Sequence, residues 1–179
     1  MRTLKDLDIE KSIKPRKLIF EESWFDKSDS FISYLIFVAL GISSVLCLDQ
    51  INPQSSNDRV GYYLFPIIIS LCLYGFYCKF FEKNLREIKF SIHKEDAKQK
   101  ILEYGKKYHY RISKISDNLI FLNEPTDDFG MKNTEKTILV FFKGDAILYT
   151  LIKEGSRLNF PVLFSQHLTR RDFKKILKK

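Results

Sequence analysis

The sequence lacks the local motifs that most enzymes use. It contains only seven glycines, and none lies in a phosphate-binding loop or in a G-x-S-x-G turn. It has no H-E-x-x-H and no C-x-x-C pair, and its three histidines, His93, His109 and His167, lie far apart. We therefore expect a non-enzymatic protein without catalytic residues, a metal site or a cofactor.

Cysteine is scarce as well. Cys47, Cys72 and Cys78 lack the spacing of metal ligands and are expected to be small apolar packing residues. Glu124, Asp127 and Asp128 are close in sequence but do not have the spacing of a calcium loop. We expect them to lie in a solvated loop.

Charge is absent from two long stretches. Nineteen residues between Asp29 and Asp49 carry no charge, and neither do the 19 residues between Arg59 and Lys79. As a helix, each stretch would be roughly 28 Å long, which is close to the hydrocarbon thickness of a bilayer. Eleven Leu, Ile, Phe and Val residues in the first stretch favour its insertion by about 3 to 7 kcal/mol. Both stretches are therefore expected to be transmembrane helices.

The first stretch does not resemble a cleaved signal peptide. Twenty-nine mostly polar residues precede it, and it is too long for the apolar segment of such a signal. We expect a segment at 1–29, a two-span hairpin at 30–82 with a loop at 49–59, and a small α+β domain at 83–179.

The distribution of basic residues predicts the orientation. Seven Lys and Arg residues precede the first span and several follow the second, whereas the loop between them has only Arg59. Since Lys and Arg are retained on the cytoplasmic side, both termini are expected there, with the loop outside. The composition, rich in Lys, Ile, Phe and Asn, suggests a bacterial source and hence the cytoplasmic membrane.

Small residues recur along one face of the first span, at Ala39, Ser43 and Cys47. Such a face lets two helices approach closely. It predicts either the packing of the two spans against each other or a seam between two copies of the chain.

The α+β domain is expected to have the order helix, four to five antiparallel strands and C-terminal helix. The second span is also expected to continue as a helix over 79–90, because Phe81, Leu85, Ile88 and Ile92 have helical spacing. The remaining elements are expected at the following residues: a helix at 94–110, strands at 110–116, 119–124, 137–142, 146–152 and 157–164, and a helix at 168–179 with a capping box of Thr169 and Asp172.

Two of these strands, at 137–142 and 146–152, are apolar, and polar and apolar residues hardly alternate along them. An antiparallel strand with one wet face should alternate, so both faces of these strands are expected to be covered. The candidates for the second cover are the membrane-proximal helix, the N-terminal segment 17–25, a second copy of the chain, or a protein partner. The side chains expected to form a partner surface are Ile138, Val140, Phe142, Ile147, Tyr149 and Leu151.

The net charge of +8 suggests contact with anionic lipid. The alternatives are anchors that only set orientation and a solvated helix face. No nucleic-acid partner is expected, because a membrane-tethered domain meets lipid first. The expected lipid contacts are Lys79, Lys83, Arg86, Lys89, Arg170, Arg171, Lys174, Lys175, Lys178 and Lys179.

The function expected from these features is that of an adaptor or scaffold. Its cytoplasmic domain would bind a protein partner or a second copy of the chain. The alternative is a membrane-perturbing or pore-forming effector that its cytoplasmic domain regulates.

Overall fold

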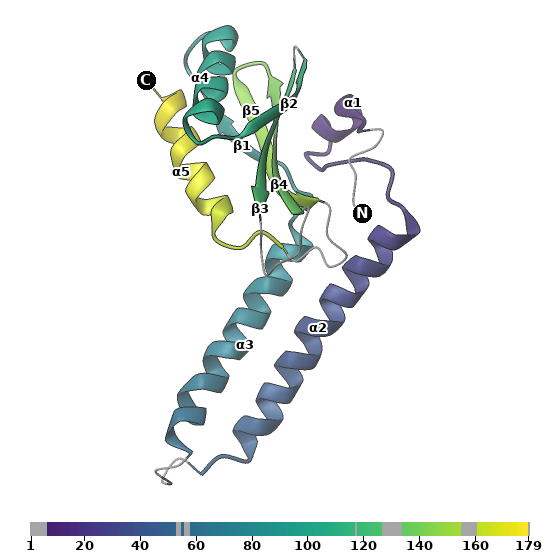
Figure 1. Ribbon diagram of the computed structural model, residues 1–179, viewed down its shortest axis with the longest axis vertical. Coiled ribbons are helices and arrows are strands. Elements are labelled where there is room, and N and C mark those ends of the chain that lie inside the picture. The colour runs from purple at the N-terminus through teal and green to yellow at the C-terminus, as the bar shows by residue number, and fades with distance from the viewer. Residues whose placement is uncertain are drawn as a thin grey trace.

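The computed structural model describes residues 7–52, 55, 58–116, 118–126, 134–154 and 161–178. In this part of the chain, two apolar helices form a hairpin, and the other elements form an α+β unit at one end of it (Figure 1). The elements are α1 (Ile9–Ile13), α2 (Trp24–Asp49), α3 (Arg59–Phe80), β1 (Arg86–Lys89), α4 (Lys94–Lys107), β2 (Arg111–Ser116), β3 (Leu119–Thr126), β4 (Thr134–Lys143), β5 (Ala146–Glu154) and α5 (Ser165–Leu177).

Helices α2 and α3 are long and apolar enough to cross a membrane, and only 11% of the most apolar stretch of each is buried within the chain. Helix α2 begins six residues earlier than expected. Its first turn has a capping box in which Ser23 Oγ accepts from the Asp26 amide at 3.2 Å and Asp26 Oδ2 accepts from the Ser23 amide at 3.0 Å. These bonds satisfy N–H groups that a helix start otherwise leaves without partners.

The two helices pack through Phe37 and Gly75, not through the expected row of small residues. A Cβ added at Gly75 would lie 2.7 Å from Phe37 Cε1, so the ring fits only because Gly75 has no side chain. Ala39, Ser43 and Cys47 are all exposed on α2. The prediction that this row packs the two spans against each other was therefore wrong.

The expected helix over 79–90 was also wrong. Helix α3 ends at Phe80, and Arg86–Lys89 forms strand β1 beside β5. Ile88 and Phe90 both point into the core beneath the sheet, which is the alternation of a strand. Pairing with β1 satisfies backbone groups of β5 that would otherwise lie at an open edge.

The five strands form one antiparallel sheet in the order β1-β5-β4-β3-β2. The hairpins expected at 110–124 and 137–152 are confirmed as β2–β3 and β4–β5. Gly144 and Asp145 connect β4 to β5 in a two-residue turn, and Gly144 has a φ of +52°, which glycine adopts without steric cost.

Helices α4 and α5 cover one face of the sheet (Figure 1). Ala97, Ile101 and Tyr104 of α4 and Phe173 and Leu177 of α5 bury the core on this side. This core also contains every residue of the expected partner surface, and each of them is at most 3% exposed: Ile138, Val140, Phe142, Ile147, Tyr149 and Leu151. These six side chains are covered by the chain's own helices and do not form an exposed surface.

The N-terminal segment covers the opposite face, as one of the expected alternatives proposed. Leu18 is 3% exposed and packs in a second core with Leu139, Phe141 and Leu148. The Leu18 amide donates to Lys83 O, and the Leu85 amide donates to Arg16 O, both at 2.8 Å. Residues 7–20 therefore pack with the sheet and not apart from it.

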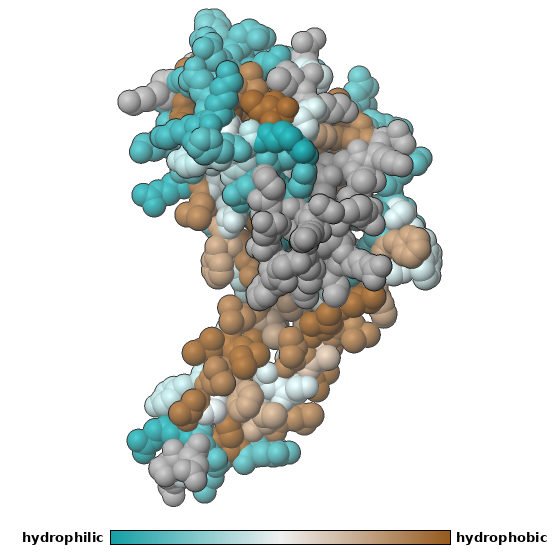
Figure 2. Space-filling view, viewed as in Figure 1, coloured by the Kyte–Doolittle hydropathy of each residue, from teal (hydrophilic) through white to brown (hydrophobic). Residues whose placement is uncertain are grey.

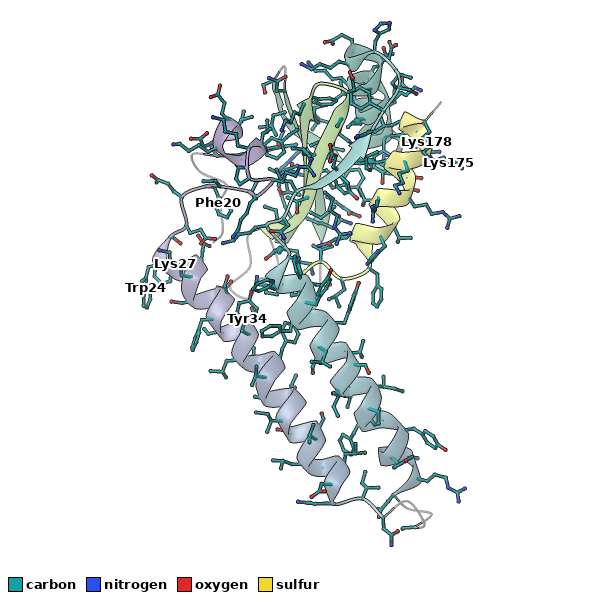
Figure 3. All side chains as sticks on the ribbon, turned by 180° about the vertical axis from the view of Figure 1, so that it is seen from behind. Phe20, Trp24, Lys27, Tyr34, Lys175 and Lys178 are labelled. Atoms are coloured by element: carbon teal, nitrogen blue, oxygen red, sulfur yellow. The ribbon has the colours of Figure 1, made fainter. Side chains whose placement is uncertain are left out.

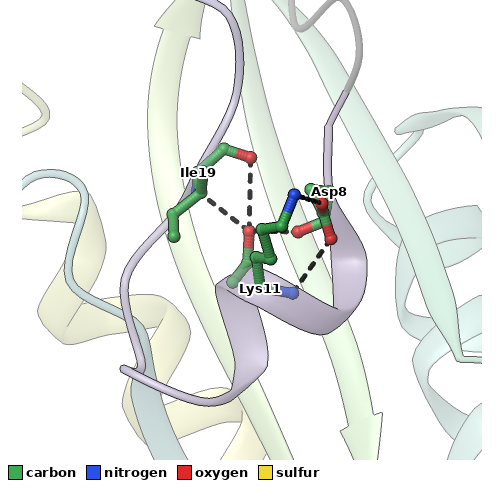
Figure 4. A network of polar contacts seen from close by, with 4 residues as sticks. Asp8, Lys11 and Ile19 are labelled. Carbon is green, nitrogen blue, oxygen red and sulfur yellow. Dashed lines mark hydrogen bonds and ion pairs between the residues drawn. The ribbon is translucent and has the colours of Figure 1, made fainter.

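A short network of hydrogen bonds connects the start of this segment, at Asp8, to its end, at Ile19 (Figure 4). Asp8 caps α1 by accepting from the Lys11 amide at 2.9 Å, and its carbonyl accepts from Ser12 Oγ at 2.6 Å. The same hydroxyl accepts from the Ile19 amide at 2.9 Å. Ser12 is fully buried, so its hydroxyl bonds fix where the chain turns back toward the sheet.

The C-terminal helix starts earlier than expected. Helix α5 begins at Ser165, so Thr169 lies inside the helix and is buried, and the predicted capping box with Asp172 was wrong. Of the last expected strand, residues 157–160 lie outside the described part of the chain, and residues 161–163 belong to no strand.

We predict that the N-terminal cover is essential for stability. Replacing Leu18→Ala should lower the free energy of unfolding by about 2 to 5 kcal/mol, because the site is buried against several strands. Replacing the neighbouring, exposed Ile19→Ala should change it by less than about 1 kcal/mol. Denaturant unfolding of the purified full-length chain measures both, and equal losses would contradict the assignment.

Candidate functional site

The surface of the hairpin is apolar between two polar ends (Figure 2). Around the end that adjoins the sheet, large apolar side chains from distant parts of the sequence are exposed. They come from the start of α2, the end of α3 and the start of α5: Trp24, Phe25, Phe31, Phe80, Phe164 and Leu168. The segment before α5 is attached to α3, because Tyr74 Oη donates to Leu163 O at 3.3 Å and stacks on Phe164.

A cavity lined by charged and aromatic residues lies where the hairpin meets the sheet, and we call it the junction pocket. Its volume is about 470 Å³. Lys17 comes from the N-terminal segment, Lys27 and Tyr34 from α2, and Lys83 from the residues after α3. Phe31 and Phe80 line it on the side of the hairpin. Figure 3 shows Lys27 at the start of α2 and Tyr34 farther along that helix, between α2 and α3.

A buried ion pair supports the junction pocket. Lys79 Nζ lies 3.1 Å from Glu82 Oε2, and the two side chains are only 3% and 2% exposed. The Glu82 carbonyl also accepts from Thr150 Oγ1 at 2.7 Å, which joins the end of α3 to β5. The cost of burying two charges makes such a pair sensitive to the loss of either partner.

The first four expected lipid contacts fall into different environments. Lys79 is buried in its ion pair, while Lys83 lines the junction pocket, pairs with Glu22 and lies 5.8 Å from the centroid of the Phe20 ring. Arg86 donates to Gln166 of α5 at 2.5 Å. Lys89 is exposed at the end of β1. Only Lys83 of these four is both accessible and close to the hairpin.

The expected basic residues of α5 are exposed, but the helix leads away from the hairpin. Lys175 and Lys178 lie at the end of the α+β unit remote from the hairpin (Figure 3). Lys179 lies outside the described residues. The exposed basic residues of α5 are Arg170, Arg171, Lys174, Lys175 and Lys178. This geometry separates the C-terminal lysines from the junction pocket.

A second cavity of about 430 Å³ lies between α4 and α5, and we call it the α4–α5 groove. Tyr104, Tyr108 and Ile176 give it an apolar floor. Charged residues of both helices surround this floor: Lys100, Lys107 and Lys175, together with Glu103 and Asp172. Lys107 Nζ lies 5.6 Å from the centroid of the Tyr108 ring, within the range of a cation–π contact.

Three tyrosines at the groove and in the core beside it have raised pKa values. Burial, together with the nearby Tyr110 and Asp172, raises the pKa of Tyr104, whose hydroxyl donates to Asp172 Oδ2 at 3.3 Å. Burial and the Glu124 carboxylate raise the pKa of Tyr110 to about 12. Burial also raises the pKa of Tyr149 to about 12.

The described residues do not assemble an evident reaction centre. His93 precedes α4 and His109 follows it, so a 14-residue helix of roughly 21 Å separates them. No group of three or more His, Cys, Asp or Glu side chains in the described ranges is placed to hold a metal ion. Glu124 pairs with Lys136, while Asp127 and Asp128 lie outside the described ranges.

The residues of α2 that line the junction pocket were not among the predicted site residues. The pattern Ser23-x-x-Asp26 is a capping box and would have placed the helix start at Trp24. Lys27 and Tyr34 then lie seven residues apart on one helical face. Lys17 carried no such signal, because only the tertiary fold brings it to α2.

Comparison of the chain with protein-family models, with curated proteins and with solved structures gives no match.

We predict that the buried pair is strongly coupled. Lys79→Met should lower the free energy of unfolding by about 3 to 5 kcal/mol, because the buried Glu82 carboxylate loses its ion-pair partner. The double variant Lys79→Met with Glu82→Leu should recover most of that loss. As a control, Arg111→Met at the more exposed pair with Glu135 should cost less than about 1 kcal/mol. Additive effects at Lys79 and Glu82 would contradict the coupling.

We also predict a loss of stability at alkaline pH. A tyrosine whose pKa is about 10 when unfolded and about 12 when folded stabilises the fold fully below pH 10, and this contribution disappears as pH rises toward 12. Denaturant unfolding at pH 9 and pH 11 should show a smaller loss for Tyr110→Phe than for the unaltered chain. Equal losses would show that Tyr110 ionises equally well in both states.

Proposed function

We propose that this chain is a two-span integral protein of a bacterial cytoplasmic membrane, with both termini in the cytoplasm. The observation that carries the proposal is the low burial of α2 and α3, whose most apolar stretches are only 11% covered by the chain. Two such helices would expose a large apolar surface to water, which soluble proteins avoid. A bilayer covers that surface.

Exposed aromatic side chains at both ends of the hairpin support the placement of α2 and α3 in a bilayer. Trp24, Phe25 and Phe80 surround the end of the hairpin next to the sheet, and aromatic residues favour the interface of a bilayer. At the other end, Tyr62 and Tyr63 are exposed in the first turns of α3. The connecting loop has one basic residue, whereas the segment before α2 has several, as expected of an external loop.

We further propose that the α+β unit is a non-enzymatic adaptor that binds an acidic segment of a protein partner. The α4–α5 groove supports this role, because aromatic side chains form its floor and its rim has three lysines against two carboxylates, of which Asp172 accepts a hydrogen bond from Tyr104. Its residues Lys107 and Lys175 lie on helices that cover the sheet on one side, away from the N-terminal segment. A groove of this kind suits carboxylates flanked by an apolar residue.

Cysteine labelling tests the membrane topology. In a background with the three native cysteines replaced by alanine, Ser55→Cys in the loop should react with a membrane-impermeant maleimide on intact cells. The matched variant Ser91→Cys, exposed in the α+β unit, should react only after the cells are permeabilised. Labelling of both variants, or of Ser91→Cys alone, would refute the orientation.

Quantitative co-purification tests the adaptor role. The full-length chain and the variant Lys107→Glu with Lys175→Glu are purified from native membranes in mild detergent, and Lys89→Glu with Lys143→Glu is the control of equal charge change. We expect a stoichiometric acidic partner with the chain and with the control, reduced roughly tenfold or more with the groove variant. If neither variant loses the partner, binding at the α4–α5 groove is refuted. Leakage of liposomes that contain the reconstituted protein would favour the pore-forming alternative.

A further inference from the structure

The junction pocket has a composition that neither a structural role nor the adaptor role requires. Four lysines, Lys17, Lys27, Lys79 and Lys83, line it together with two glutamates, Glu22 and Glu82. Lys79 pairs with Glu82, and Lys83 pairs with Glu22. The ion pairs of the described residues include neither Lys17 nor Lys27. The exposed side chains of Lys17 and Lys27 border the same pocket and add positive charge to it.

An apolar groove lies between α2 and α3, farther along the hairpin from the pocket. This groove has a volume of about 370 Å³, and almost all of its lining is apolar. On α2 the pocket uses Lys27, Phe31 and Tyr34, and the groove continues with Phe37, Gly41 and Val45. These positions recur every three or four residues, so they share one helical face.

Helix α3 repeats the same succession in the opposite direction. Lys79 and Phe80 line the pocket, while Phe76, Cys72 and Ile69 line the groove. Tyr34 and Phe76 lie between the two cavities, with ring centroids 4.9 Å apart. A cavity with four lysines and two glutamates is thus followed along the hairpin by an apolar one.

We propose that the junction pocket and this groove together bind one molecule of an anionic glycerophospholipid. The headgroup phosphate lies between the ammonium groups of Lys17 and Lys27, and one acyl chain occupies the groove between α2 and α3. The inference rests on the proposed membrane function. In a bilayer, the boundary between the headgroups and the hydrocarbon would lie where the junction pocket adjoins the groove. The pocket volume is in the range of small-molecule sites, and the two lysines favour an anionic over a zwitterionic headgroup.

The proposed site forms only when the fold brings Lys17 and Lys27 to the same pocket. Lys17 is brought to α2 by the contact of Leu18 with the sheet and by the bridge between Lys17 and Asn84. Lys27 lies in the first turn of α2, which the Ser23–Asp26 capping box fixes. The bound lipid would therefore connect the N-terminal segment to the hairpin at the membrane surface.

Lipid retention tests the proposal. The full-length protein is delipidated in detergent and placed in nanodiscs of phosphatidylcholine with a small fraction of phosphatidylglycerol. It is then re-extracted, and the lipid that remains bound is quantified by mass spectrometry. We expect about one phosphatidylglycerol per chain, and retention roughly 10- to 30-fold lower for Lys17→Gln with Lys27→Gln. The control Lys89→Gln with Lys143→Gln has the same net charge and should retain the lipid fully.

A second variant tests the acyl-chain part of the site. A Cβ added at Gly41 would lie 4.0 Å from Cys72 Cβ, so a side chain can be added there without a backbone clash. Gly41→Leu should fill the groove and lower phosphatidylglycerol retention without a change in charge. Unchanged thermal unfolding of each variant confirms that the fold is intact.

The possible outcomes separate this proposal from the membrane function. Extraction of the protein from membranes by alkaline carbonate would refute the membrane function itself. A protein that stays in the membrane but retains phosphatidylglycerol equally in the pocket variant and its control would refute only the lipid site. Equal retention of phosphatidylcholine, or full displacement of the lipid by soluble glycerol phosphate, would also refute it.

Discussion

The apolar character of both faces of strands β4 and β5 constrains the whole molecule. Ile138 and Val140 face one side, and Leu139 and Phe141 face the other, so neither side of the sheet can meet water. Helices α4 and α5 pack against the first side of the sheet and cover it. The second side is covered by residues that precede the hairpin, among them the short helix α1. The N-terminal segment must therefore return to the sheet before α2 begins.

This return determines where the two apolar helices are attached. The segment around Leu18 pairs with the residues just after α3, so the start of α2 and the end of α3 lie side by side. Charged residues from both ends then meet in a small volume. Lys79 and Glu82 are buried there and neutralise each other, whereas Lys17 and Lys27 remain at the border of the pocket. The positive charge of the junction is thus a consequence of how the sheet is covered.

The groove between α4 and α5 has a different origin. Both helices bury their apolar faces in the core of the sheet, and their basic faces remain outside. Where the two basic faces adjoin, Tyr104 and Tyr108 form an apolar floor, and Asp172 accepts a hydrogen bond from Tyr104. The two lysine-bordered sites are therefore separate: one adjoins the hairpin, and the other lies on the outer helices.

The sequence by itself determined the elements with strong local signals. The two charge-free stretches, helix α4 and the hairpins β2–β3 and β4–β5 follow from periodicity and turn residues that act over a few positions. It also determined that both faces of the central strands are covered. Only the tertiary structure decided that residues 86–89 pair with β5 instead of extending α3, because Phe81, Leu85 and Ile88 fit a helix as well as Ile88 and Phe90 fit a strand. It also decided that the N-terminal segment supplies the second cover and that Lys17 and Lys27 line the same pocket, since contacts between residues distant in sequence leave no local pattern to read.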